Sequence, residues 1–138
     1  MLKISLPIEP VGKGRPRSTK SGRVYTPQKT RDNQKQIQNH LQQIIELNKP
    51  YFLNLPRDEF DQVTIEFYLP RPKRLYRRKD PVGRIPHRTK PDLDNLLKQI
   101  LDSCEGYLWN NDKTIHNIHP SKWYCEAYGK PRIEITIS

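Results

Sequence analysis

Three short stretches of alternating apolar and polar residues constrain the fold of this chain more than any other feature. Residues 2–8, 63–69 and 133–137 each place a large apolar side chain at every second position. Successive side chains of a strand point to opposite faces, so a period of two predicts half-buried β-strands. A fourth stretch, roughly 114–128, predicts one more strand, with Trp123 and Cys125 on one face and Lys122 and Tyr124 on the other.

Two segments between these strands repeat their apolar residues with the spacing of a helix instead. The first runs from about 27 to 47, where Thr26 and Pro27 have the order typical of a helix start and Ile37 and Leu41 lie one turn apart. The second runs from about 92 to 104. At roughly 100° per residue, its apolar side chains fall on one broad face, namely Leu93, Leu96, Leu97, Ile100, Leu101 and Cys104.

The order β-α-β-α-β-β predicts a small α/β (α+β) fold with a mixed four-stranded sheet and two helices. At 138 residues, the chain is expected to form one domain spanning residues 1–138. We expect a hairpin around Ser21 and Gly22, and a second hairpin in the segment YGKPR (128–132) before the last strand. Cys104 and Cys125 fall at expected core positions and predict no disulfide framework.

The charge balance points to a polyanionic partner. The chain has 25 Lys and Arg residues against 15 Asp and Glu, a formal net charge of +10. Nucleic acid fits this excess best, although a basic protein without such a partner would have the same composition. No segment approaches the ~20 apolar residues that span a bilayer, and two cysteines suit a reducing compartment, so we expect a cytoplasmic location without membrane contact.

Most of the positive charge lies in two irregular segments rich in glycine and proline, residues 9–27 and 71–91. The second has about 20 residues without periodicity, a length typical of functional or disordered loops. Its Tyr76 and His87 could stack on unpaired bases, and the alternative for the whole segment is a solvated loop without a ligand. Cations that neutralise phosphates would come from both segments, and the predicted DNA-binding residues are Lys13, Arg15, Arg17, Lys73, Arg74, Arg77, Arg78, Arg88 and Lys90.

The segment TKPDLDNLLKQILDSC (89–104) places Asp92 and Asp94 on either side of one leucine, with Lys98 four residues after Asp94. Ordinary roles account for each residue alone, Asp92 as a helix N-cap and Asp94 with Lys98 as an exposed ion pair. Magnesium binding accounts for all of them, because Mg²⁺ takes oxygen ligands, neutralises a phosphodiester and generates hydroxide near neutral pH. If the turn after the helix folds back, Asp112 in WNNDKTI joins the pair, and Lys98 stabilises the transition state. Spacing alone leaves both interpretations open.

The whole pattern resembles the RusA family of Holliday junction resolvases, small Mg²⁺-dependent endonucleases found mostly in phages and prophages. The resemblance rests on D-L-D-N-L-x-K at 92–98, the helix that follows, a short glycine and aromatic turn, and Asp112 before a hydrophobic strand. The segments GKGRPR and GRVYTP resemble the phage and Gram-positive branch of the family. These matches together extend over most of the chain.

The resemblance implies that Asp92, Asp94 and Asp112 bind the metal and that Lys98 completes the catalytic set. It implies Mg²⁺ as the cofactor, with Mn²⁺ as a substitute, and a homodimer whose two active sites make paired nicks in four-way DNA junctions during recombination and repair. The protein is then expected in the cytoplasm of a bacterial host, encoded by a phage or prophage. Asn111 stands where members often carry a second acid, which favours a single metal ion.

Two other functions fit the same residues. The first is a non-catalytic module that binds branched DNA and uses the acids only for capping and pairing. The second is a nuclease of the same fold that prefers flaps or replication forks. Metal dependence separates the first from a resolvase, and a panel of DNA substrates separates the second.

Overall fold

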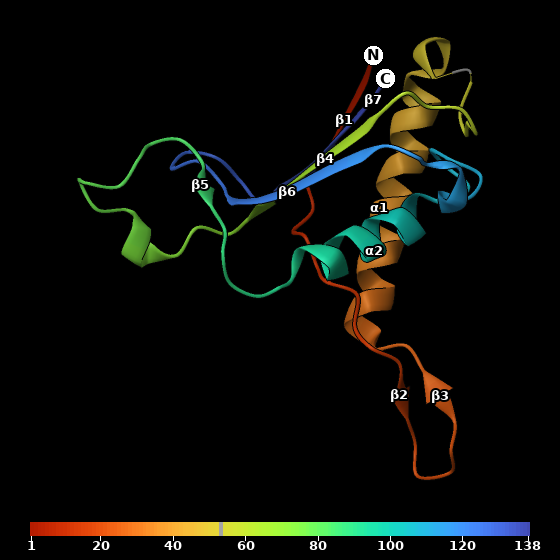
Figure 1. Ribbon diagram of the computed structural model, residues 1–138, viewed down its shortest axis with the longest axis horizontal. Helices are drawn as coiled ribbons and strands as arrows, with labels where there is room; N and C mark the ends of the chain where they lie inside the picture. Colours follow the sequence, from red (N-terminus) through yellow and green to blue (C-terminus); the bar gives the residue numbers. More distant parts are fainter. Residues whose placement is uncertain (53) are drawn as a thin grey trace.

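The computed structural model describes residues 1–52 and 54–138. Five strands form the main sheet in the order β1-β7-β4-β6-β5, and β2 and β3 form a separate hairpin (Figure 1). The strands are β1 (Leu2–Leu6), β2 (Arg17–Ser18), β3 (Val24–Tyr25), β4 (Val63–Leu69), β5 (Ile85–Pro86), β6 (Ile118–Tyr124) and β7 (Arg132–Ile137). The helices are α1 (Gln28–Leu47) and α2 (Leu93–Cys104), with 3₁₀ turns at Lys49–Tyr51, Lys73–Leu75 and Asp112–Thr114.

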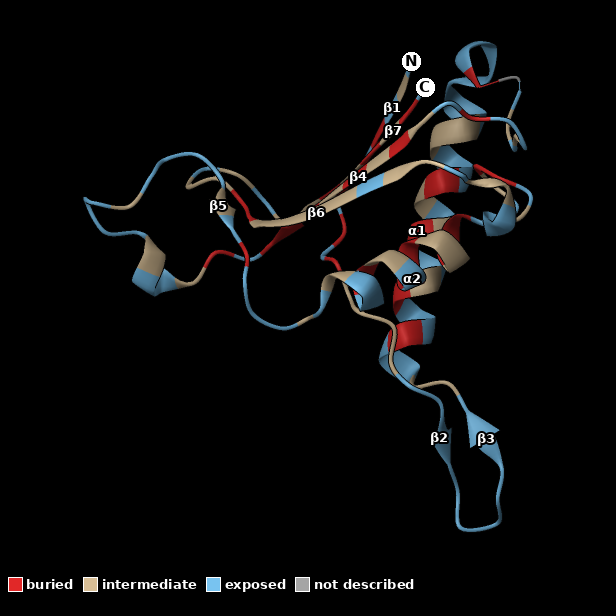
Figure 2. Cartoon of the chain, in the orientation of Figure 1, coloured by how far each residue is buried: buried red, intermediate tan, exposed pale blue. Residues whose placement is uncertain are grey.

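The core lies between the sheet and the two helices, which pack on the same side of it (Figures 1 and 2). Ile4, Ile135 and Ile65 are neighbours in the register of β1, β7 and β4, and each is at most 4% exposed. Ile37 and Leu41 of α1 are fully buried against this face. The alternation in the sequence thus produces one buried face, while the other face of the sheet carries polar side chains, among them Lys3, Ser5, Thr64, Glu66 and Glu134.

The expected α+β fold with two helices is confirmed, and α1, α2, β4 and β7 lie within one residue of their expected bounds. The strand expected over 2–8 ends at Leu6, and the one expected over 114–128 spans only Ile118–Tyr124. The sheet has a fifth strand because Ile85 and Pro86 pair with Tyr124 and Trp123. Two residues are too few to produce a recognisable period, so β5 was not expected.

The expected hairpin at YGKPR is wrong. β6 pairs with β4 in parallel, and β7 pairs with β4 in antiparallel fashion on its other side, so β6 and β7 are not neighbours. Parallel strands need a crossover connection, and α2 supplies it between β4 and β6. The segment 128–132 therefore passes across the end of β4, and β7 lies inside the sheet with β1 and β5 at the edges.

Cys125 is buried as expected, but it follows the end of β6, and the residues of β6 that face the helices are those on the side of Lys122. Lys122 pairs with Phe67 and Tyr124 with Leu69, so Lys122 and Tyr124 belong to the face covered by the helices. Trp123 pairs with Tyr68 on the opposite face, where the guanidinium of Arg84 lies 3.7 Å from the centre of the indole. Arginine stacking covers the tryptophan without a second layer of structure.

Two segments project from the body of the molecule, the β2–β3 hairpin and the loop 71–91 (Figure 1). The hairpin expected around Ser21 and Gly22 is confirmed, and Gly22 adopts a φ of 83° there. The loop is organised by Arg71, which is 7% exposed and donates hydrogen bonds to the carbonyls of Leu75, Pro81 and Gly83 at 2.9, 2.5 and 3.3 Å. None of the helices formed by residues 1–52 and 54–138 is long and apolar enough to cross a membrane.

Candidate active site

Asp92 and Asp94 lie at the beginning of α2, and both are exposed. Asp92 is the residue before the helix, and its backbone carbonyl accepts a hydrogen bond from the amide of Leu96 at 3.1 Å. Its side chain accepts no hydrogen bond from the first turn. One oxygen of Asp94 accepts from the amide of Asn95 at 2.9 Å.

Two ordinary roles were considered for these residues, a side-chain N-cap by Asp92 and an ion pair between Asp94 and Lys98, and the described residues show neither. Asp92 occupies the N-cap position without using its carboxylate as a cap. Among the residues that the structure describes, no ion pair joins Asp94 to Lys98. Two exposed carboxylates therefore lie close together at a helix N-terminus, where the positive end of the helix dipole stabilises them.

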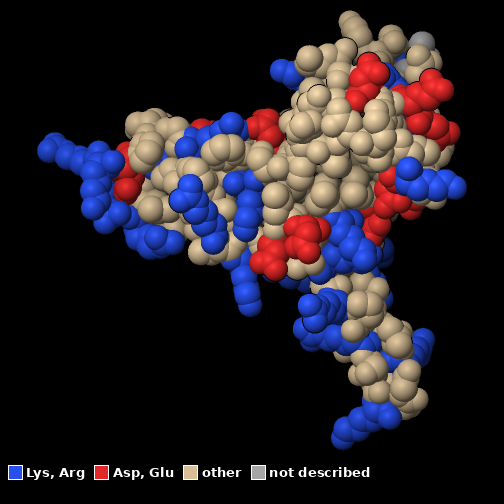
Figure 3. Space-filling model, in the orientation of Figure 1, with Lys and Arg blue, Asp and Glu red and all other residues tan. Residues whose placement is uncertain are grey.

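A groove of about 650 Å³ opens beside Asp92, between the loop after β1 and the start of α2. Figure 3 shows acidic atoms at the start of α2 with basic atoms on both sides, toward the hairpin and toward the 71–91 loop. Four cations, Lys13, Arg15, Lys29 and Lys90, line the groove against the two carboxylates of Glu9 and Asp92, so its excess of positive charge suits a polyanion. The charged and amide residues that line it are Glu9, Lys13, Arg15, Lys29, Lys90, Asp92 and Asn95.

Lys13 fixes the loop after β1 to α2. Its amide donates to the carbonyl of Asn95 at 3.0 Å, and its ammonium forms an ion pair with Asp102 of the same helix. The glycines beside it allow close packing, because a Cβ at Gly14 would lie 2.9 Å from Cγ of Pro27. Lys13 thus has an intramolecular partner, whereas Arg15 remains exposed.

The other predicted DNA-binding residues lie on the two projections. Arg17 is exposed on β2 of the hairpin, and Arg77 of the loop forms an ion pair with Asp80 at 3.3 Å. A string of exposed cations therefore extends along the loop toward Asp92. Its members are Lys73, Arg74, Arg78, Arg88 and Lys90.

The expectation that His87 is available to stack on bases is wrong. Its side chain is 7% exposed, and its ring lies 4.4 Å from the ring of Tyr124, centre to centre. The pKa of the imidazole is lowered because burial disfavours the charged ring and because Lys122 repels it. Tyr76 is 51% exposed, with the guanidinium of Arg71 lying 5.1 Å from the centre of its ring.

We predict that lowering the pH from about 7 to about 5 reduces the free energy of unfolding more in the wild type than in a His87→Phe variant. The pKa of His87 in the folded state lies below its ordinary value of 6.5, so the unfolded chain binds more protons in that window. Stability that is present above pH 6.5 is then lost as the pH falls toward the lower folded-state pKa. Urea denaturation at both pH values measures the difference. Equal losses in the two proteins would contradict the prediction.

Asp112 is not brought to the acidic pair, so the turn after α2 does not fold back as expected. Its position at the other end of α2 is fixed by backbone hydrogen bonds from Arg57 to Leu108 at 3.0 Å and from Asn110 to Arg57 at 3.4 Å. The fully buried Trp109 donates to the carbonyl of Leu101 at 3.2 Å. Asn111 caps the 3₁₀ turn by accepting from the amide of Lys113 at 3.0 Å.

The distance from Asp112 to Asp92 and Asp94 decides whether one chain can bind a metal ion with all three carboxylates. A helix of 12 residues is about 18 Å long, whereas oxygens bound to Mg²⁺ lie about 2.1 Å from the ion. Within residues 1–52 and 54–138, no three acidic, histidine or cysteine side chains form a group that could hold a metal. Asp92 and Asp94 still suit Mg²⁺, which commonly binds one or two carboxylates and keeps several waters. Lys98 is exposed one turn beyond Asp94.

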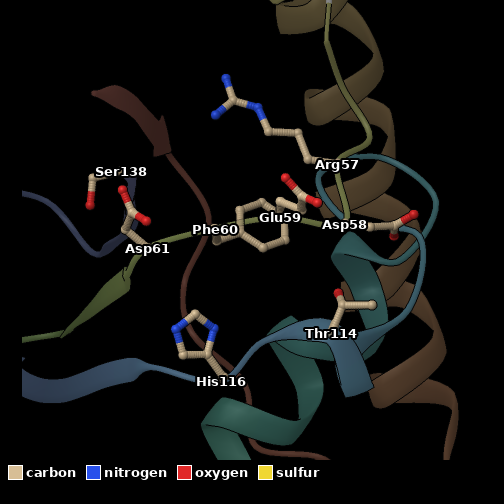
Figure 4. Close-up of a pocket in the computed structure, with 8 residues that line it drawn as sticks. All are labelled: Arg57, Asp58, Glu59, Phe60, Asp61, Thr114, His116 and Ser138. Atoms are coloured by element: carbon tan, nitrogen blue, oxygen red, sulfur yellow. The ribbon is translucent and has the colours of Figure 1, made fainter.

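A second hollow, of about 510 Å³, lies at the opposite end of α2 from the acidic pair. Figure 4 shows Thr114 and His116 pointing toward the segment 57–61 from the chain that leads into β6. Asp58, Glu59 and Asp61 line this hollow against the single cation Arg57. An acidic lining repels a phosphate backbone, so the groove beside Asp92 is the better site for DNA.

Sequence reasoning missed two residues that support the acidic pair. Asp102 binds Lys13, and Lys122 donates hydrogen bonds to the carbonyls of Thr89 and Pro91, just before Asp92. A lysine in a strand and an aspartate in a helix both suggest exposed surface. No sequence signal therefore identified either one.

Comparison with known proteins identifies the family of the chain. A protein-family model described as Endodeoxyribonuclease RusA matches residues 7–138, which include the acidic pair, the groove and both basic projections. The chain is also similar to a protein of Bacillus subtilis (strain 168) named Uncharacterized protein YqaN. The two are 26% identical over 142 residues, covering 99% of this chain and 94% of that protein. The chain therefore belongs to the RusA family of endodeoxyribonucleases, which are hydrolytic nucleases.

Proposed function

We propose that this protein is a Mg²⁺-dependent, structure-selective endodeoxyribonuclease that resolves four-way DNA junctions by paired nicks. The observation that carries the proposal is the exposed pair Asp92 and Asp94, which lies between two basic projections. Among the described residues, Asp92 does not cap the helix with its side chain and Asp94 forms no ion pair. Two acids on the DNA-binding side of a basic protein would repel phosphates, and a cation bound between them would remove that repulsion. Membership of the RusA family supports the same reaction.

The proposed roles follow from what each side chain can contact. Asp92 and Asp94 hold Mg²⁺, which when bound supplies an acidic water and neutralises charge on the scissile phosphate. Lys98, exposed on the same edge of α2 as Asp94, stabilises charge that develops on the phosphate. The predicted DNA-binding residues hold the phosphate backbone, with Arg15 in the groove and the others on the hairpin and the loop.

We further propose that Asp112 acts in the active site of a partner subunit. Leu93, Leu97 and Leu101 follow one another at four-residue intervals along α2 and are only half-buried. Residues four apart share a helix face, so this stripe offers an apolar surface for a second α2. Two copies packed antiparallel about a two-fold axis would place the end of each helix beside the start of the other. The partner subunit's Asp112 would then complete the acidic group that one chain lacks.

This arrangement requires the expected homodimer and would account for a symmetric product. Each dimer would contain two equivalent sites, and a four-way junction has two equivalent strands to cut. A site completed across the interface would make cleavage depend on dimer formation. The chain alone would then be a DNA-binding protein without cleavage activity.

Cleavage of synthetic DNA tests the function. We expect paired symmetric nicks in a four-way junction in Mg²⁺, no cleavage in EDTA, and little cleavage of a duplex of matched sequence. Preferential cutting of flaps or forks would instead assign a different substrate to the same chemistry. Tight junction binding in Ca²⁺ with no cutting of any branched substrate in Mg²⁺ would show a binding module and overturn the proposal.

A further inference from the structure

Lys122 of β6 contacts the chain immediately before the proposed metal-binding pair. Its ammonium donates to the carbonyl of Thr89 at 2.5 Å and to the carbonyl of Pro91 at 2.8 Å. Lys122 is half-buried on the helix-covered face of the sheet, in register with Phe67. In the part of the chain that the structure describes, it forms no ion pair with a carboxylate.

The two carbonyls bracket the last residues before α2. Pro91 directly precedes Asp92, and Asp92 in turn begins the helix that carries Asp94. The same segment is held to β6 at its other end, where the amide of His87 donates to the carbonyl of Lys122 at 3.3 Å. The hydroxyls of Thr89 and Tyr124 lie 3.3 Å apart. Of these contacts between the segment and β6, the one from Lys122 to Pro91 is nearest in sequence to Asp92, and its hydrogen bond is strengthened by the charge of the ammonium.

Proline is frequent in the loop that leads to this point, and residues 87–92 form neither helix nor strand. The direction of the Asp92 side chain therefore depends on how this segment is attached to the sheet. Metal sites lose affinity when the groups that orient their ligands are removed, because the ligands must then be ordered upon binding. A half-buried ammonium between two carbonyls supplies that attachment here.

We propose that Lys122 is a positioning residue that orients Asp92 and Asp94 for binding a divalent cation. The inference rests on the proposed metal site and adds to it a residue that contacts neither metal nor DNA. The inference predicts the direction in which the affinity for the cation changes when Lys122 loses its charge. Removing a positive charge beside two carboxylates should by itself strengthen cation binding, whereas loss of positioning weakens it.

The test measures Mn²⁺ binding to the full-length protein without DNA, from the electron paramagnetic resonance signal of free Mn²⁺. Lys122→Met, which keeps the length of the side chain and removes its donors, should weaken Mn²⁺ binding about tenfold. Lys122→Arg, which keeps charge and donors, should recover most of the affinity. Lys3→Met removes the same charge from exposed β1 and should bind Mn²⁺ like the wild type.

Two outcomes separate this inference from the proposed function. If Asp94→Asn binds Mn²⁺ as well as the wild type does, the metal site itself is wrong. If Asp94→Asn loses binding but Lys122→Met binds Mn²⁺ equally or more tightly, the metal site stands and the role of Lys122 is overturned. Thermal unfolding of each variant establishes that it is folded. Should Lys122→Met not fold, Lys122→Gln, with one shorter amide donor, replaces it and must also bind Mn²⁺ more weakly.

Discussion

Replacing Asp94 with asparagine should lower the rate of junction cleavage by at least about a hundredfold, because removing even a group that only orients a metal ligand costs 10–100-fold. Asparagine has the size of aspartate and can still accept a hydrogen bond from the amide of Asn95. The helix should therefore form as before, and the loss should come from the missing charge. Junction binding in Ca²⁺ should change little, since the basic projections supply most phosphate contacts.

Single-turnover cleavage and gel-shift binding measure the two effects separately. Glu59→Gln is the matched control, because Glu59 is an exposed carboxylate in the acidic hollow at the other end of the molecule. It should cleave and bind as the wild type does. An Asp94→Asn variant that cleaves at the wild-type rate would show that the pair is not a metal site. A variant that loses folding and binding together would instead assign Asp94 to the stability of α2.

Mixing two inactive variants should restore nicking if Asp112 acts across the dimer. In a dimer of Asp94→Asn with Asp112→Asn, one site combines both substitutions, and the other combines an intact acidic pair with an intact Asp112. Random pairing makes about half of the dimers mixed, so about a quarter of the wild-type number of sites should be intact. Each mixed dimer has a single working site. It should nick one strand without resolving the junction.

A supercoiled plasmid with an extruded cruciform distinguishes these products, because one nick gives an open circle and two paired nicks give a linear molecule. The co-expressed variants, purified as mixed dimers through two different tags, should give open circles only. Asp94→Asn paired with a chain that carries both substitutions is the control and should remain inactive. If the mixed dimers stay as inactive as either parent, Asp112 does not complete the partner's site.

Sequence patterns predicted the local structure around the candidate residues better than they predicted which of these residues lie together. D-L-D-N-L-x-K placed Asp92, Asp94 and Lys98 at the beginning of a helix, and α2 begins at Leu93. That prediction rests on local information, since helix periodicity and start signals lie within a few residues. The relation of Asp112 to the pair is not local. It depends on whether the chain after α2 turns back, and its bridges to Arg57 and the burial of Trp109 decide that it does not.

The faces of β6 show the same limit. Alternation of Trp123 with Lys122 predicted a strand with these two residues on opposite faces, but it did not indicate which face the helices cover. Arg84 covers Trp123 on the open face of the sheet. On the face covered by the helices, Lys122 donates hydrogen bonds to the carbonyls of Thr89 and Pro91. The partners of both side chains come from the loop between β4 and α2. The pattern of residues within β6 alone does not reveal these partners.

The sequence by itself determined the two helices, the four longer strands, the basic surface and the residue types of the acidic pair, because these depend on periodicity, composition and short-range spacing. Tertiary structure alone decided three other features: the parallel pairing of β4 with β6, the isolation of Asp112, and the attachment of the Asp92 segment to Lys122. Each of these joins residues that are at least 31 positions apart or depends on which strands become neighbours. Such contacts are fixed by packing of the whole chain, which no local pattern encodes.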